Sequence, residues 1–262
     1  MKKHQKVLNL ALGFTGLLIL ATSSTHAAVV TYIDLFNTSQ QISTNNAVVT
    51  NTVTSAGAIG GYRTLVMNTS GGDPEFPQNS TITVSTNTQR FALSSPTDTV
   101  SFFEIKWGGA DGTNGFGPVD FTDALGTNFS LGGSTLDFKL RSADQANNFT
   151  WTFTDTANNV ATYTGNFPAY SSTNPALPYA ISLASFSGSG TIDWTSINFI
   201  TLAGGGISDL DMGIFAPISV TAQSIPEPGT WAAAGLLLLT ALYIRWRRSQ
   251  AVATQEEATA AA

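Results

Sequence analysis

Polar and apolar residues alternate along most of the chain between residues 29 and 224, and this pattern constrains the fold more than any other feature. Phe149, Trp151 and Phe153, for example, are each followed by a threonine. Because successive side chains of a β-strand point to opposite faces, a period of two predicts strands with one buried and one solvated face. We therefore interpret these three aromatic residues as a core stripe rather than an exposed surface for sugars.

Many other segments of this region share the pattern, and none shows a helical period. Strands are expected at 29–36, 47–54, 62–68, 80–86, 89–95, 99–107, 136–140, 149–154, 160–164, 179–186, 191–202 and 207–221. Breaks rich in Gly, Asn and Pro separate them. Without helices to cover a parallel sheet, the fold class is all-β, and we predict one antiparallel two-sheet sandwich, with a jelly roll as the favoured topology. No repeat of 20–50 residues suggests a propeller or solenoid.

Charge and composition exclude several classes of function. The chain has 11 Lys+Arg, 17 Asp+Glu and no cysteine. Six of the basic residues lie at the two ends, so the region 29–224 is acidic and has no basic stripe for nucleic acid. The absence of cysteine excludes disulfides, thiolate nucleophiles and cysteine-ligated metals.

The N-terminal segment 1–27 has the three parts of a secretory signal peptide. Lysines precede an apolar stretch from Val7 to Ala21, and a small-residue segment follows it. Cleavage after Ala27 is expected, because Thr25 and Ala27 are then the small residues at positions −3 and −1. We predict export, with 28–224 as the ectodomain.

The C-terminal segment contains a second apolar stretch, which ends in a basic cluster. Residues 229–244 carry no charge, and Arg245, Arg247 and Arg248 follow them. A helix of this length approaches the thickness of a bilayer core, and the arginines predict that its end faces the cytoplasm. A single membrane span is therefore expected, with 249–262 as a short cytoplasmic extension.

Pro226, Glu227 and Pro228 lie directly before this stretch. Together with the span and the arginine cluster, they make 225–248 resemble the PEP-CTERM sorting tail of exported proteins in Gram-negative, exopolysaccharide-producing bacteria. The resemblance implies transient recognition by exosortase, removal of the tail near the motif, and release to the cell surface or extracellular matrix. The fourteen residues after the arginines depart from the family, whose tails usually end within a few residues.

The ectodomain has a second resemblance. It is similar to a jelly-roll ectodomain often seen in PEP-CTERM proteins. The similarity lies in the segments Trp107-Gly-Gly-Ala-Asp-Gly112, Gly117-Pro-Val-Asp-Phe121 and 194–202, followed by Asp209-Leu-Asp211. That layout is distantly similar to galactose-binding-like carbohydrate modules. The resemblance implies a role in carbohydrate binding.

Few residues are suited to catalysis. Both histidines precede the expected cleavage site, so the mature chain lacks a histidine base or ligand and no catalytic residue is assigned. We interpret Glu104 as a solvent-facing strand residue. The spacing of the acidic residues along the sequence does not identify a pair of carboxylates of the kind that glycosidases use. No cofactor or metal is assigned, although Asp111 with Asn114, or Asp209 with Asp211, would offer oxygen ligands to a structural calcium ion.

Exposed aromatic rings are the remaining candidates for binding sugars. Trp107, Tyr170 and Tyr179 adjoin loops rich in glycine or proline and are the preferred platforms. The function expected from sequence is a non-enzymatic surface or matrix protein, associated with exopolysaccharide and biofilm. Two alternatives remain: a periplasmic or surface carbohydrate-active enzyme, and a permanently membrane-anchored periplasmic protein.

Overall fold

The alternating segments form thirteen strands in the computed structural model, which describes residues 29–72, 75, 78–109, 117–125, 129–222 and 235–246. The strands are β1 (Val29–Asp34), β2 (Gln40–Thr44), β3 (Val48–Thr54), β4 (Tyr62–Gly71), β5 (Ser80–Ser85), β6 (Arg90–Ser94), β7 (Thr99–Trp107), β8 (Ser134–Ala143), β9 (Asn147–Asp155), β10 (Val160–Phe167), β11 (Leu177–Ser182), β12 (Ile197–Ser208) and β13 (Met212–Ala222). Three helical turns lie between them among the described residues, namely η1 (Ile59–Gly61), α2 (Phe121–Ala124) and η3 (Leu183–Ser185).

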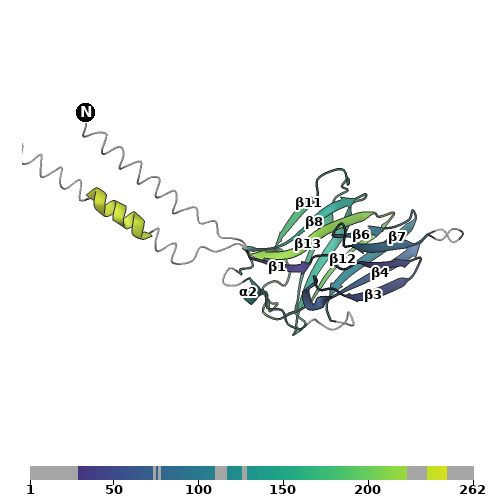
Figure 1. The fold of residues 1–262 in the computed structure, drawn as a ribbon, viewed down its shortest axis with the longest axis horizontal. Coiled ribbons are helices and arrows are strands. Elements are labelled where there is room, and N and C mark those ends of the chain that lie inside the picture. The colour runs from purple at the N-terminus through teal and green to yellow at the C-terminus, as the bar shows by residue number, and fades with distance from the viewer. Residues whose placement is uncertain are drawn as a thin grey trace, which may run out of the picture. The chain divides into compact units, whose positions relative to one another are not determined.

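The strands form two antiparallel sheets packed face to face (Figure 1). Sheet A has seven strands in the order β11-β8-β13-β6-β5-β2, with β1 also paired to β13, and sheet B has six in the order β10-β9-β12-β7-β4-β3. The predicted antiparallel two-sheet sandwich is confirmed. Within it, β6 pairs with β13, β7 with β12, β8 with β11 and β9 with β10, and these nested pairs alternate between the sheets. Such nesting is the strand arrangement of a jelly roll.

Several strand predictions were inaccurate, three of them for a clear local reason, and the strand expected at 207–221 begins only at Met212. Strand β2 was missed because its sequence, Gln-Gln-Ile-Ser-Thr, has one apolar residue and therefore hardly any alternation. The strand expected at 191–202 starts only at Ile197, because the Asp193 side chain accepts hydrogen bonds from Thr195 and closes a turn. The strand expected at 179–186 ends at Ser182, where η3 begins.

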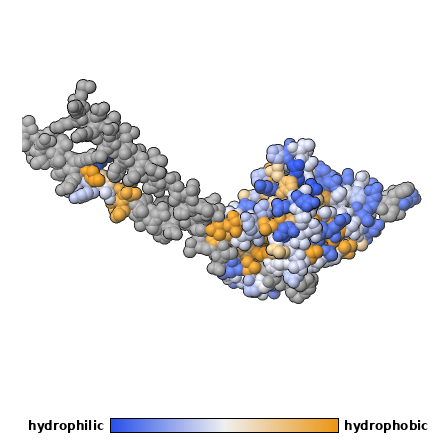
Figure 2. All heavy atoms as spheres, in the orientation of Figure 1, coloured by the Kyte–Doolittle hydropathy of each residue, from blue (hydrophilic) through white to orange (hydrophobic). Residues whose placement is uncertain are grey.

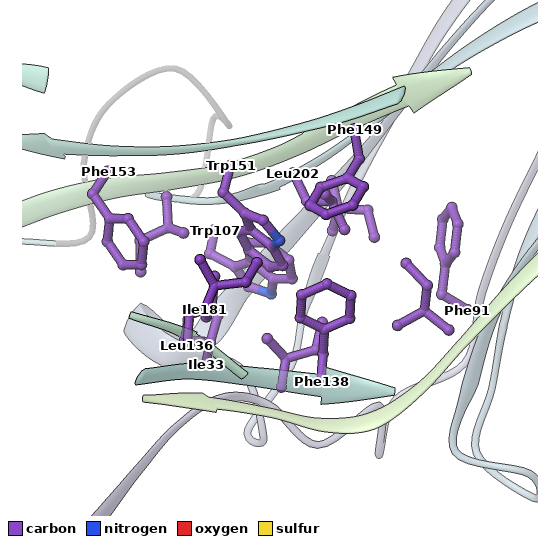
Figure 3. Close-up of a cluster of buried hydrophobic side chains, with 14 of the residues drawn as sticks. Ile33, Phe91, Trp107, Leu136, Phe138, Phe149, Trp151, Phe153, Ile181 and Leu202 are labelled. Carbon is purple, nitrogen blue, oxygen red and sulfur yellow. The ribbon is translucent and has the colours of Figure 1, made fainter. Parts of the chain in front are cut away.

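The core between the sheets is rich in aromatic residues (Figure 3). Trp107 of β7 and Trp151 of β9 stack with their ring centroids 5.6 Å apart, and Phe138 of sheet A approaches Trp151 to 5.7 Å. Phe149, Trp151 and Phe153 are all buried, so the prediction of a core stripe on β9 is confirmed. Contacts of this kind across the two sheets hold the sandwich together.

The segments predicted to direct export lie mostly outside the described residues. This holds for the signal peptide with Ala27, for Pro226, Glu227 and Pro228, and for Arg247 and Arg248. Residues 235–246, which include Arg245, form a helix in a unit separate from Ala28–Gln223. Among the described residues, no helix has the length and apolar character needed to cross a membrane.

Candidate functional site

A groove of about 500 Å³ lies on the outer face of sheet B. We call it the sheet B groove. Its lining comes from four neighbouring strands: Val66 and Asn68 of β4, Phe102, Phe103 and Glu104 of β7, Asn148 and Thr150 of β9, and Ala203, Gly204 and Gly205 of β12. The strand register explains why these residues lie next to one another. Thr150, Ala203, Glu104 and Val66 are direct cross-strand partners, so their side chains form one row across the sheet.

Phe102 supplies an exposed aromatic ring at this groove. The residue is 49% exposed, although Phe103 beside it on β7 is buried. The glycines of β12 make room for the ring, because a Cβ added at Gly206 would lie 2.7 Å from Phe102 Cε1. Gly206 also has φ +85°, a conformation that favours glycine. A bulge between Gly205 and Ile207 interrupts the pairing with β7 at this point.

Polar groups surround the ring. Glu104 Oε2 lies 3.0 Å from Lys106 Nζ, and both side chains are partly exposed. Asn148 Oδ1 accepts a hydrogen bond from Asn166 Nδ2 at 3.2 Å, which leaves the amide N–H groups of Asn148 available. The groove thus combines an apolar ring with a carboxylate and two side-chain amides, and the ammonium of Lys106 beside it balances the charge of the carboxylate. Figure 2 shows one face of the molecule, on which hydrophobic residues form separate spots among hydrophilic ones.

The aromatic platforms expected from sequence lie elsewhere, and the prediction for Trp107 was wrong. Trp107 is fully buried, and its Nε1 donates a hydrogen bond to Asp34 Oδ2. Its position could have shown this, because Phe103, Ile105 and Trp107 share one face of β7. The same alternation places Phe102 on the outer face, and that residue was missed.

Both tyrosines are half-buried. Tyr179 stacks on Phe138 of the core at 4.8 Å and donates a hydrogen bond to Asn166 O, so it is not an exposed platform. Burial raises the pKa of its hydroxyl, and the charge of nearby Tyr163 raises it further. Tyr170 is half-buried and lines a second groove, on sheet A. Glu104 faces outward on β7, as the sequence predicted.

The candidate calcium ligands do not form a cluster in the described part of the chain. Asp111 and Asn114 lie outside it. Asp209 and Asp211 lie in the turn between β12 and β13, where Asp211 Oδ1 accepts a hydrogen bond from the Ser95 backbone N–H. The described residues contain no group of three or more His, Cys, Asp or Glu side chains that could hold a metal ion.

Asp155 accepts four hydrogen bonds, and its role is structural. Desolvation raises the pKa of its carboxyl group, but four hydrogen bonds outweigh this effect and lower the pKa below its usual range. The donors are the Asp193 N–H, the Asn159 side chain, and the Asn159 and Ala157 N–H groups. The carboxylate thereby ties the turn after β9 to the segment before β12. It takes no part in lining the sheet B groove.

No protein-family model matches the chain, and no curated protein matches it. Solved structures that match the chain include an exo-β-agarase, with 11% identity and a TM-score of 0.40 over 78% of this chain. A family 11 carbohydrate-binding module of a cellulosomal cellulase from Clostridium thermocellum is 12% identical, with a TM-score of 0.36, and the match covers 78% of this chain and 99% of that one. A family 30 carbohydrate-binding module is 10% identical, with a TM-score of 0.36, over 70% and 99% of the two chains. The chain spans only 26% of the agarase. At these values the likeness does not assign the chain to a family.

Proposed function

We propose that the chain is a polysaccharide-binding protein without catalytic activity, and that it binds sugar chains in the sheet B groove. The observation that carries this proposal is the exposed ring of Phe102 beside the carboxylate of Glu104 and the amides of Asn68 and Asn148. The carbon-bound hydrogens of a sugar form an apolar face that packs on an aromatic ring, and its hydroxyls pair with carboxylates and amides. A concave site with an aromatic surface and a few polar groups is typical of small-molecule and sugar sites.

The charges in the groove favour a neutral sugar. Glu104 and Lys106 neutralise one another, so an anionic or cationic ligand would gain little net attraction. The hydroxyls of a neutral sugar both donate and accept hydrogen bonds, and they therefore suit a carboxylate and an amide equally. Binding of this type depends only weakly on salt.

The arrangement of carboxylates supports binding without hydrolysis. Glycosidases place two carboxyl groups about 5 to 9.5 Å apart on either side of the scissile bond. Glu104 is the one carboxylate among the described residues that line the groove. A carbohydrate-active enzyme is the rival hypothesis, and hydrolysis abolished by Glu104→Gln would establish it.

The proposed setting is outside the cytoplasm. A signal peptide at 1–27 would export the chain, and the tail at 225–248 would hold it in the inner membrane until an exosortase removes the tail near Pro226-Glu227-Pro228. The mature protein would then reach the cell surface or extracellular matrix, where exopolysaccharide is its expected partner. The support for this part is the pattern of the sequence ends.

Affinity electrophoresis of the full chain tests the binding proposal. The gels contain agarose, a neutral β-glucan or the uronate-rich polysaccharide alginate. Phe102→Ala is expected to remove the retardation by a neutral polysaccharide, whereas Val160→Ala, which removes a comparably exposed apolar side chain from β10 outside the groove, keeps it. Equal behaviour of the two variants would reject the groove as the binding site.

A further inference from the structure

A second groove, on sheet A, is unexplained by the proposed function. It has a volume of about 660 Å³, and its lining includes Arg90, Ser142, Asp144, Tyr170, Ser171 and Asp211. We call it the sheet A groove. The bridge between Ala143 and Tyr170 holds the segment 169–172 against the end of β8, and this segment forms one wall. The groove therefore lies on the other sheet of the sandwich from the sheet B groove.

Arg90 is the cation of this groove, and its side chain has no hydrogen bond or ion pair within the described part of the chain. Its buried Nε has no hydrogen-bond partner among the described residues, and no salt bridge joins it to Asp144 or Asp211. A polar group without a partner is costly in a folded protein, and because Nε itself is buried, a ligand in the groove would reach this guanidinium through its Nη groups.

Gly213 positions the Arg90 side chain. A Cβ added at Gly213 would lie 3.2 Å from Arg90 Cδ and 3.6 Å from Arg141 Cβ. The missing side chain therefore leaves space for Arg90 to cross β13 from β6 towards β8. Arg141 is engaged otherwise, because its Nη1 donates to Asn174 O and its guanidinium lies over the Phe215 ring. Arg90 is thus the arginine that is free to bind in the groove.

The two carboxylates of the groove retain capacity to accept hydrogen bonds. Asp144 Oδ1 accepts a hydrogen bond from the Asp211 N–H at 2.8 Å, and Asp211 Oδ1 accepts one from the Ser95 N–H at 3.3 Å. The second oxygen of each carboxylate has no hydrogen bond within the described part of the chain. One guanidinium and two carboxylates give the groove a net negative charge, which disfavours an anionic ligand.

We infer that the sheet A groove is a second sugar-binding site, for a neutral hexose unit. Hexose hydroxyls accept hydrogen bonds from Arg90 and donate to Asp144 and Asp211, so one neutral ligand satisfies all three groups. This inference rests on the proposed function, because it makes the molecule bivalent. The two grooves are lined by strands of different sheets, so one molecule binds two polysaccharide strands and cross-links them, and avidity strengthens its hold on a polysaccharide network.

Titration calorimetry of the full chain tests the inference, with neutral β-glucan oligosaccharides of four to six hexoses as the probe. The wild type is expected to bind two equivalents. Arg90→Met keeps the aliphatic length but removes the guanidinium, and it should bind one equivalent with the affinity of the sheet B groove. Asp211→Asn, which keeps an acceptor for Ser95, should weaken the sheet A site at least tenfold. Lys139→Met removes a cation from the same outer face outside the groove lining and should leave both sites unchanged.

Cross-linking provides an independent readout. Wild-type protein mixed with long β-glucan should raise turbidity, and both Arg90→Met and Phe102→Ala should abolish the rise.

If Arg90→Met still binds two equivalents, or if Lys139→Met acts like Arg90→Met, the inference is wrong and the proposed function stands. If Phe102→Ala alone has no effect on stoichiometry, the sheet B proposal fails while the sheet A site stands. Tighter binding of oligomers of alginate than of the neutral probe would overturn the assignment of a neutral ligand.

Discussion

Asp34 of β1 and Arg63 of β4 form a fully buried ion pair that joins sheet A to sheet B, with 3.0 Å between Asp34 Oδ2 and Arg63 Nη1. A bulge between Tyr32 and Asp34 turns the carboxylate inward. Trp107 Nε1 donates to Asp34 Oδ2, the Phe36 N–H donates to Asp34 Oδ1, and Arg63 Nε donates to Gln40 Oε1. Each charge is therefore surrounded by hydrogen-bond partners, which a buried ion pair requires.

Removal of either member of this pair leaves the other buried without a partner. Asp34→Ala is expected to lower the free energy of unfolding by about 3–5 kcal/mol, whereas Glu104→Ala, at the partly exposed pair with Lys106, costs about 1 kcal/mol or less. Urea denaturation measures both values. Replacement of both Asp34 and Arg63 should cost less than the sum of the single changes, and strict additivity would argue against a coupled pair.

The position of the Phe102 ring depends on Gly206, and a pair of glycine variants tests this. Gly206→Ala introduces a positive-φ alanine whose Cβ would lie 2.7 Å from the Phe102 ring, whereas Gly61→Ala introduces the same backbone strain at φ +78° with no atom within 4 Å. Both variants should lose about 1–2 kcal/mol of stability from the backbone. Only Gly206→Ala should also weaken binding of neutral polysaccharide in affinity gels, and an equal loss of binding in both would contradict the role of the ring.

The lowered pKa of Asp155 predicts a loss of stability in acid. Its pKa is lower in the folded than in the unfolded state, so its stabilising contribution is present above pH about 4 and disappears as the pH falls through the folded-state value. Urea denaturation between pH 5 and pH 2.5 should show this decline. Asp155→Asn should reduce stability at pH 7 and flatten the decline, because an amide has one acceptor oxygen and does not titrate. The exposed Asp98→Asn serves as the control, and the same flattening there would contradict the assignment.

Glu104 is expected to contribute to sugar binding but not to hydrolysis. The full chain is expected to release no reducing sugar from agarose or β-glucan above background, because the groove lacks a second carboxylate among its described residues. Glu104→Gln should weaken binding of neutral polysaccharide by roughly ten- to hundredfold, since one hydrogen bond to a charged group contributes about 1.5–3 kcal/mol. Retardation should be similar in 50 mM and 500 mM salt, and a steep decrease with salt would mean that charge dominates recognition.

The tail predicts the mass of the mature protein. If 225–248 acts as a sorting signal, the protein recovered outside the inner membrane should end near Pro226-Glu227-Pro228. Replacement of this tripeptide by alanines should leave full-length protein in the membrane fraction, because recognition is lost but the arginines still resist translocation. Intact-mass spectrometry of both fractions decides the matter, and a surface form that retains Arg245 would favour a permanent anchor instead.

The alternation of residue types was sufficient to predict which side chains of a strand are buried. It correctly placed Phe149, Trp151 and Phe153 in the core and Glu104 on the outer face, because the period of two is a local property of an extended chain. Applied consistently to β7, it would also have placed Trp107 inside and Phe102 outside. The prediction that Trp107 is exposed was wrong because it relied on the glycine-rich segment after Trp107 rather than on the strand that contains it.

The neighbours of each strand were decided only by the tertiary structure. Asn68, Phe102 and Asn148 are distant in sequence, and they meet because β4, β7, β12 and β9 are adjacent in sheet B. Likewise, Arg90 and Asp144 line one groove only because β6, β13 and β8 are adjacent in sheet A. Local alternation carries no information about which strands pair or in which register, because long-range hydrogen bonding and the packing of the two sheets set both. The sequence alone therefore determined the sandwich and its inner and outer faces, whereas both candidate grooves depend on the order of strands within the sheets.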